Sequence, residues 1–403
     1  MAQGKRQPDQ AAEARIRLRM EEAERAVFED DRTRRYRISR RGRTLFALGI
    51  ALFPLYFLCI FLPNGVAAKT SLSLAWYLEM VVQNIATFGT WATGGETSST
   101  RLLFIQYIIV ALVGSALALS GAVYQGAFRN ALASPSTLGV QSGGVLGGTL
   151  FVLFAMRDDG TNLFADESPR LLARFGLSFS ILLGCLFMVA AVSLAARAFS
   201  RSGRMSTLVL VLCGMVFAGG VAEILGLIQY RMMVTNTFDN RTYALRYMLM
   251  GSFQGVYTPM HLALISIPVC AAGAVIMAMR GRLNLIVFGE DEARSMGVRV
   301  PLIRNLTVGV VTLLTAVVLS FCGMIGFVGL IVPHVARRMV GPDFNYLIPA
   351  SALLGAASMM LVFHIASALG LATNINMMTS LVGGILFFCM LLYYRRRGHA
   401  DWA

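Results

Sequence analysis

Long apolar runs, separated by short polar stretches, dominate the pattern of this chain. One of them, "TLFALGIALFPLYFLCIFL" at 44–62, has no charged residue, and similar runs recur almost to the C-terminus. Each approaches or exceeds the roughly 20 residues that a helix needs to cross the hydrocarbon core of a bilayer. A helix is the expected form, because it satisfies its own backbone hydrogen bonds in lipid. The pattern therefore predicts an all-α polytopic membrane protein.

About ten membrane spans fit the pattern best. They are expected near 44–62, 103–124, 138–156, 176–197, 206–229, 259–279, 304–323, 325–340, 347–370 and 377–394. The eighth is short and contains Pro333, so a bent or partly inserted helix is expected there. The membrane domain is thus predicted over 44–397, after a charged tail at 1–43 and before a short tail at 398–403.

Positive charge lies mainly beside the spans. The chain has 35 Lys and Arg against 21 Asp and Glu, and the excess falls largely in the even-numbered links and in "RRR" at 395–397. Positively charged links stay in the cytoplasm, so both termini are predicted to be cytoplasmic. This distribution gives no reason to expect nucleic acid as a partner. The N-terminal tail is either solvated or bound to anionic lipid headgroups.

One polar link stands out between the sixth and seventh spans. It reads "GRLNLIVFGEDEARSMGVRV" at 281–300. Gly289 breaks the preceding segment, and acidic residues at 290–292 suit the first turn of a helix, where the helix dipole favours them. Ala293, Met296 and Val298 are expected to form a small apolar face on this helix. Such a helix is suited to dock in a groove of a soluble partner, although a solvated loop is the simpler alternative.

Three motifs, in this order, carry a family resemblance. They are "GSALALSGAVYQGAFRNALASPSTLGVQSGG" (114–144), "GEDEARSMGV" (289–298) and "GMIGFVGLIVPHVARRMVGPD" (323–343). Together they resemble the FecCD permeases, the membrane subunits of bacterial ABC importers for iron-siderophore complexes, haem and vitamin B12. The resemblance extends from about residue 44 to the last span and leaves out the N-terminal tail.

The resemblance implies a type II ABC importer permease in the bacterial cytoplasmic membrane. Two permease subunits would enclose a central pathway, with two ATP-binding subunits beneath and an external lipoprotein that delivers an iron-siderophore complex. Haem and vitamin B12 are the alternative substrates. The chain has no GxxxxGK[ST] phosphate loop, so it is expected to be a transport subunit without its own ATPase site or cofactor. ATP and Mg²⁺ would act on the partner ATPase.

The same resemblance assigns roles to particular residues. The link at 281–304 would be the ATPase-coupling segment, and spans 5 and 10 would line the pathway. Glycines in "GGVLGG" (143–148) and "GMIGFVGL" (323–330) would let helices pack closely. The coupling residues would be Gly289, Glu290, Ala293, Arg294 and Gly297, and the cytoplasmic gate residues would be Ser206 and Thr207.

Several positions depart from the family pattern. The outer end of span 2 lacks the usual Arg-x-Pro-Arg, which leaves Arg101 as the nearby cation, and "TNINMMTS" precedes span 10 in place of Ile-Pro-Val-Gly. In span 9, His364 stands where an Asp is typical, and Ala368 stands where an Arg is typical. This variant pattern is similar to family members that form one half of a heterodimeric permease. A heterodimer is therefore favoured over a homodimer.

Few single residues suggest chemistry of their own. Glu223, the one carboxylate well inside span 5, either faces the pathway or bonds to another helix. His364 is either neutral and bonded to a neighbouring helix or faces the pathway, whereas His334 is expected to form a hydrogen bond at a helix end. The six cysteines are solitary, so no metal site is expected.

Two other classes of function are less well supported. An ion-coupled secondary transporter would need carboxylates near the midplane on broken helices, and Glu223 alone provides little. A membrane-embedded enzyme would need a catalytic motif such as HExxH or GxSxG, and neither occurs.

Overall fold

The computed structural model describes residues 40–56, 96–155, 171–199, 207–234, 240–253 and 259–397, and within these ranges the chain is helical with no strand. A first helix covers 40–56. The others are α3 (Glu96–Ala127), α4 (Val140–Ala155), α5 (Leu171–Ala198), α6 (Thr207–Val234), α7 (Asn240–Met250), α8 (Pro259–Phe288), α9 (Glu290–Ser295), α10 (Val300–Cys322), α11 (Val328–Val340), α12 (Phe344–Ala368) and α13 (Ile375–Arg397).

The predicted class, an all-α polytopic membrane protein, is confirmed. Within the described residues, six helices are long and apolar enough to cross a membrane. Shorter apolar segments lie in α4 and α13. Every predicted span overlaps a described helix, although residues 57–62 of the first span, 156 of the third and 206 of the fifth lie outside the described part of the chain. The eighth span corresponds to α11, which has only 13 residues and contains Pro333.

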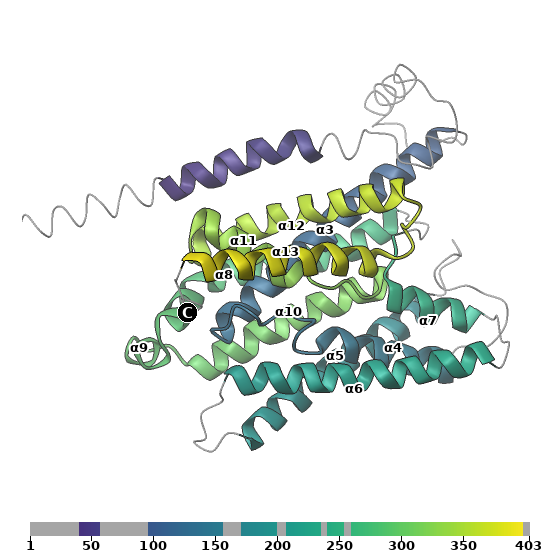
Figure 1. The fold of residues 1–403 in the computed structure, drawn as a ribbon, viewed down its shortest axis with the longest axis horizontal. Coiled ribbons are helices and arrows are strands. Elements are labelled where there is room, and N and C mark those ends of the chain that lie inside the picture. Colours follow the sequence, from purple (N-terminus) through teal and green to yellow (C-terminus); the bar gives the residue numbers. More distant parts are fainter. Residues whose placement is uncertain are drawn as a thin grey trace, which may run out of the picture.

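Helix α3 is the centre of the bundle. It packs against α8, α10, α11 and α12, and Figure 1 shows it crossing the bundle between α12 and α10. Two of its glycines meet glycines of other helices, Gly114 against Gly355 of α12 and Gly121 against Gly329 of α11. A Cβ atom at either α3 position would collide with the opposite backbone. These glycines therefore allow the helix axes to approach closely.

The "GGVLGG" segment makes a second close helix crossing. Gly143 and Gly147 of α4 face Gly184 of α5, and Cβ atoms added to them would meet the α5 backbone. Gly144 and Gly148 lie against side chains of Cys185 and Met248. The predicted close-packing role of these glycines is confirmed.

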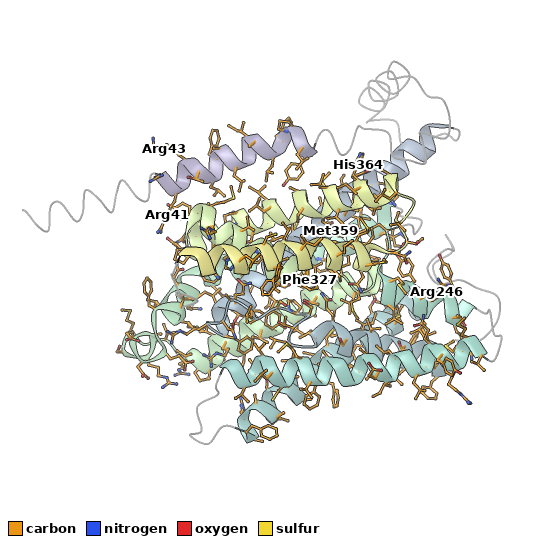
Figure 2. All side chains as sticks on the ribbon, in the orientation of Figure 1. Arg41, Arg43, Arg246, Phe327, Met359 and His364 are labelled. Atoms are coloured by element: carbon orange, nitrogen blue, oxygen red, sulfur yellow. The ribbon has the colours of Figure 1, made fainter. Side chains whose placement is uncertain are left out.

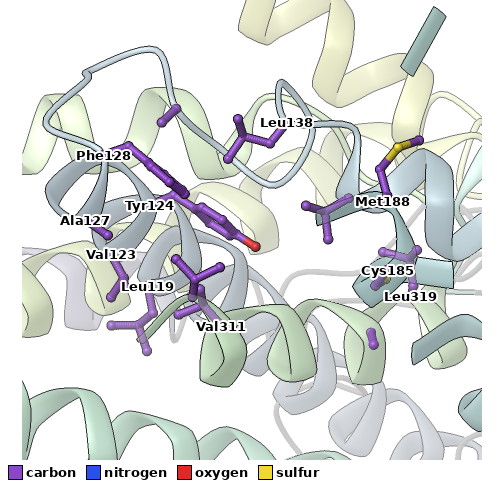
Figure 3. Packing of buried hydrophobic residues seen from close by; sticks show 14 of the residues in the cluster. Leu119, Val123, Tyr124, Ala127, Phe128, Leu138, Cys185, Met188, Val311 and Leu319 are labelled. Carbon is purple, nitrogen blue, oxygen red and sulfur yellow. The ribbon is translucent and has the colours of Figure 1, made fainter. Parts of the chain in front are cut away.

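A large apolar core joins α3, α4, α5 and α10. In its centre the ring of Tyr124 stacks on Phe128 with 6.0 Å between ring centroids, and the Tyr124 hydroxyl is 2.8 Å from Oγ1 of Thr312. Figure 3 shows Cys185 and Met188 of α5 in the same cluster. The phenol thus has a polar partner inside an apolar environment, as a buried tyrosine requires.

The backbone between α10 and α11 is irregular and is held by other parts of the chain. Gly323 and Phe327 have positive φ angles, 70° and 62°. The Gly326 amide donates to Oδ1 of Asn376 at 3.0 Å, and Nε2 of Gln141 donates to the Ile325 carbonyl at 2.9 Å. Non-helical backbone in a membrane protein needs such partners, because lipid offers none.

The two ends of the bundle can be distinguished by their contacts. At one end, here called the α9 end, Nδ2 of Asn284 in α8 donates to Oδ1 of Asp343 at 2.8 Å, just before α12. At the other, the α7 end, the Ile375 amide donates to the Gly251 carbonyl at 3.0 Å. Figure 2 shows Arg41 toward the α9 end and His364 toward the α7 end.

Candidate functional site

The predicted short helix between spans 6 and 7 is present as α9, six residues from Glu290 to Ser295. Gly289, before it, is buried, and a Cβ atom there would collide with the Glu292 carboxylate. After it, Gly297 has φ +80°, a conformation that favours glycine, and its amide donates to the Arg294 carbonyl at 2.9 Å. The local backbone therefore requires glycine at 297, whereas at 289 a larger residue would displace only the flexible Glu292 side chain.

The side chain of Ala293 faces inward. It is fully buried and belongs to an apolar cluster with residues of α8 and α10: Met279, Ile286, Val300 and Ile303. Met296, in contrast, is 66% exposed, and Val298 is half-buried. The expectation that Ala293, Met296 and Val298 share one apolar face holds for Ala293 and Val298, because Val298 packs against the same cluster. It is wrong for Met296, and the shared face is turned toward the chain itself. Ala293 anchors α9 and is not available to fill a partner's groove.

Glu290 forms the polar attachment of α9. Its carboxylate pairs with the Arg304 guanidinium of α10 and lies 3.4 Å from an Nη atom of Arg294. Arg294 also lies 3.3 Å from the Asp291 carboxylate. Because Arg294 is half-exposed, its two pairs within α9 contribute little to stability. The pair with Arg304 is more enclosed and fixes the start of α9 to α10.

The charges around Glu290 keep it ionised. Burial alone would raise the pKa of this carboxyl group, but the hydrogen bond from Arg304 and the charges of Arg304, Arg294 and Arg129 lower it overall. Arg129 follows the end of α3, so two further elements of the bundle contribute to the electrostatics of α9.

The remaining side chains of this region form a surface on the α9 end, here called the α9 outer surface. Its members are exposed: Phe288, Asp291, Glu292, Arg294, Ser295 and Met296. Phe288 is 81% exposed, and together with Met296 it places two large apolar side chains among charged ones. Figure 1 shows α9 projecting from the bundle. This arrangement is suited to docking and has no catalytic constellation.

Among the described residues, the helices that pack most against α9 are α8 and α10, which contain none of the predicted gate and pathway residues. Ser206 lies outside the described residues, and Thr207 is the first residue of α6. Glu223 lies in α6 and is exposed on this chain, so it is not buried against another helix of the same subunit. His364 is half-buried, with Nδ1 3.1 Å from the Tyr107 hydroxyl of α3. His364 therefore forms a hydrogen bond with a neighbouring helix, which was the first of the two roles expected for it.

One feature of the site was not identified from the sequence. Arg304 was only one member of a basic group, and its pairing with Glu290 spans 14 positions across a turn. The available signal was its place at the edge of an apolar span, where an ionisable residue suggests a specific partner. In addition, no group of three or more metal-ligating side chains is found within the described part of the chain.

The long apolar helices define an integral membrane protein of the all-α class. Comparison with known proteins gives the family. The model of the FecCD transport family matches residues 58–393. The chain therefore belongs to the FecCD transport family of ABC importer permeases.

Curated relatives are named as permease proteins. The molybdate import system permease protein MolB of Haemophilus influenzae is 34% identical over 72% of this chain and 80% of its own length. The cobalamin import system permease protein BtuC of Halobacterium salinarum is 33% identical over 71% of each chain. The hemin transport system permease protein HmuU of Yersinia pestis is 30% identical over 72% of this chain and 82% of its own length.

A solved structure has the same fold. It is described as an inward-facing conformation of a metal-chelate type ABC transporter, and it is 28% identical with a TM-score of 0.66. The match covers 87% of this chain and 99% of the other. Family and fold agree with the resemblance carried by the three motifs, and the chain is a multi-pass transport subunit of an ABC importer.

Proposed function

We propose that this chain is the permease that carries an iron-siderophore complex across the bacterial cytoplasmic membrane, driven by a separate ATPase that grips α9. The observation that carries the proposal is the construction of α9, which is fixed on its inner side and open on its outer side. A six-residue helix is too short to be stable alone. Its stability comes from Ala293 and from the Glu290–Arg304 pair, so a force on α9 acts on α8 and α10.

The partner on the α9 outer surface is proposed to be an ATP-binding subunit, one for each permease. Phe288 and Met296 supply apolar contacts for a groove, and Glu292 and Arg294 supply charges that fix orientation. ATP and Mg²⁺ would be bound there by the partner. In this assignment Gly289, Glu290 and Gly297 shape the coupling helix.

A second permease subunit is proposed to cover α6 and α13. On α6, Val216 and Met233 are 73% and 72% exposed, and on α13 Ile385 and Phe388 are 58% and 62% exposed. Apolar surfaces of this extent face either lipid or a partner subunit. Such an arrangement would place Glu223 and the start of α6, with Ser206 and Thr207, beside the pathway. The departures from the family pattern favour a different permease as the partner, that is, a heterodimer.

The proposed substrate is an iron-siderophore complex. The metal-chelate type of the matching structure and the variant motifs support an iron-siderophore complex. The relatives named for cobalamin, hemin and molybdate support these compounds as alternatives. The external lipoprotein is expected to select among them, because it presents the cargo to the pathway.

Uptake into proteoliposomes tests the proposal. The complex would be reconstituted with its ATPase and binding protein, and radiolabelled ferric siderophores, haem, cobalamin and molybdate would be offered separately. We expect ATP-dependent uptake of a ferric siderophore. Uptake of one of the other compounds instead would identify that compound as the substrate. Uptake without the ATPase would refute ATP-driven import.

A further inference from the structure

We infer that Arg304 is a positioning residue that transmits movement of α9 to the central helix α3. This inference rests on the proposed coupling function of α9. Arg304 lies near the start of α10, and its side chain is only 18% exposed. Its Nε atom donates to the Ala127 carbonyl at 2.9 Å, and an Nη atom donates to the Glu290 carboxylate. One guanidinium group therefore joins α3 and α9.

Both acceptors lie at helix ends, and both are negative, although for different reasons. Ala127 is the last residue of α3, where carbonyl groups lack partners within the helix and the dipole is negative. Glu290 is the first residue of α9 and carries a full negative charge. The planar guanidinium presents its N–H groups in a fixed fork, so it sets the position of one acceptor relative to the other.

The apolar attachment of α9 does not provide the same connection. The cluster around Ala293 consists of residues between Met279 and Ile303 and includes none from α3. The hydrogen bond from Asn284 to Asp343 connects α8 to the start of α12. The Arg304 bridge therefore provides a direct hydrogen-bonded connection from α9 to α3, in addition to the charge of Arg129 that acts on Glu290 from beyond the end of α3.

Helix α3 is well placed to distribute such a movement. It packs against α8, α10, α11 and α12, and close glycine contacts fix it to two of them. Closely packed helices move as units and transmit displacement with little absorption. A shift at the Ala127 end of α3 would thus reach most of the bundle, whereas a shift confined to α9 would not.

Hydrogen exchange tests the inference without a transport substrate. The amides of Phe128, Arg129 and Asn130 donate to carbonyls at 124–126, so their exchange reports on the last turn of α3. The complex with its ATPase subunits would be compared in nanodiscs with and without ATP and vanadate. In the unaltered protein we expect exchange to change both at 289–297 and at 124–130. In Arg304→Gln we expect the change at 289–297 to remain and the change at 124–130 to be lost.

A matched control removes a neighbouring cation. Arg280 is exposed on α8 and precedes the 281–304 link, so Arg280→Gln should retain both changes. If 124–130 responds in Arg304→Gln as it does in the unaltered protein, or does not respond in the unaltered protein while 289–297 does, the inference is overturned. If 289–297 does not respond to ATP in the unaltered complex, the proposed coupling function fails instead.

A second variant covers the case in which Arg304→Gln does not assemble. Arg304→Lys keeps the positive charge, but an ammonium group lacks the fork that reaches both acceptors. We expect it to retain the ATPase subunits and to reduce the response at 124–130 by roughly two-fold or more, since only one of the two bonds remains. An undiminished response in this variant would equally overturn the inference.

Discussion

Gly121 shows how one residue sets the distance between two helices. It lies in α3 opposite Gly329 of α11, and an added Cβ atom would overlap the Gly329 carbonyl group. The overlap is with backbone, so no side-chain rotation can relieve it. Gly273 of α8 has open space around its Cβ position and makes a suitable comparison.

We therefore expect Gly121→Ala to lower the free energy of unfolding by about 1–3 kcal/mol, the usual cost of overpacking a close contact. Gly273→Ala should leave it unchanged or raise it slightly, since alanine favours the helix. Thermal unfolding of both variants in the same detergent measures the difference. Equal midpoints would show that α3 and α11 tolerate a wider separation than the structure has.

Glu290 gives a prediction about pH. Its folded-state pKa lies below the ordinary value of 4.5, so the ion pair stabilises the folded state when the carboxyl group is ionised. That contribution is complete above roughly pH 6 and is lost as the pH falls below the unfolded-state pKa and through the lowered folded-state pKa. The midpoint difference between the unaltered protein and Glu290→Gln should therefore be constant from neutral pH to about pH 6 and shrink in acid. A difference that grew on acidification would contradict the assigned ion pair.

At the scale of elements, the apolar spans were predictable because length and hydrophobicity alone define them. Helix α7 was not, because "NRTYALRYMLM" is short and polar and its buried Ala244, Leu245 and Met248 become apolar contacts only in the folded bundle. For α9 the helix was predicted, but the direction of Ala293 was not. Six residues make too few turns for periodicity to identify a face.

The pairing of Glu290 with Arg304 was also beyond sequence reasoning. The regular spacings of three and four residues apply within one helix, whereas this pair joins two helices across a turn that Gly297 makes possible. Ser206 lies outside the described residues, and the roles of Thr207 and Glu223 remain predictions. What the sequence could not supply was, in each case, the position of one element relative to another.

The coupling role of α9 can be tested by removing the Arg294 charge on its outer surface together with the Glu290 carboxylate that attaches it to α10. We expect the double variant Glu290→Gln, Arg294→Gln to insert normally and to lose ATP-driven uptake of a ferric siderophore and substrate-stimulated ATPase activity. The reason is that the helix loses both its fixed base and a charge on the α9 outer surface. Arg280→Gln, which removes an exposed cation of α8 just before the 281–304 link, should behave as the unaltered complex. Normal uptake by the double variant would show that α9 is not the coupling element.

At the scale of the whole molecule, the proposal requires that α9 face the cytoplasm. The structure places α9 and the start of α12 at the same end, through the bond between Asn284 and Asp343. Helix α12 then runs to Ala368, and the next residue, Leu369, is 62% exposed and begins the link to α13. Met296 and Leu369 thus mark opposite ends of the bundle, and positive charge beside the α9 end predicts that Met296 is inside.

Cysteine labelling with a membrane-impermeant maleimide measures this orientation. In a background in which the six natural cysteines are replaced, Met296→Cys should react in inside-out vesicles and Leu369→Cys in right-side-out vesicles. Each variant is the control for the other, because both side chains are exposed and differ mainly in the side of the membrane they face. ATP is supplied only in the cytoplasm, so an α9 that reacted from the outside could not meet an ATPase. That single result would remove the coupling proposal and the role of Arg304 while leaving the fold and the family intact.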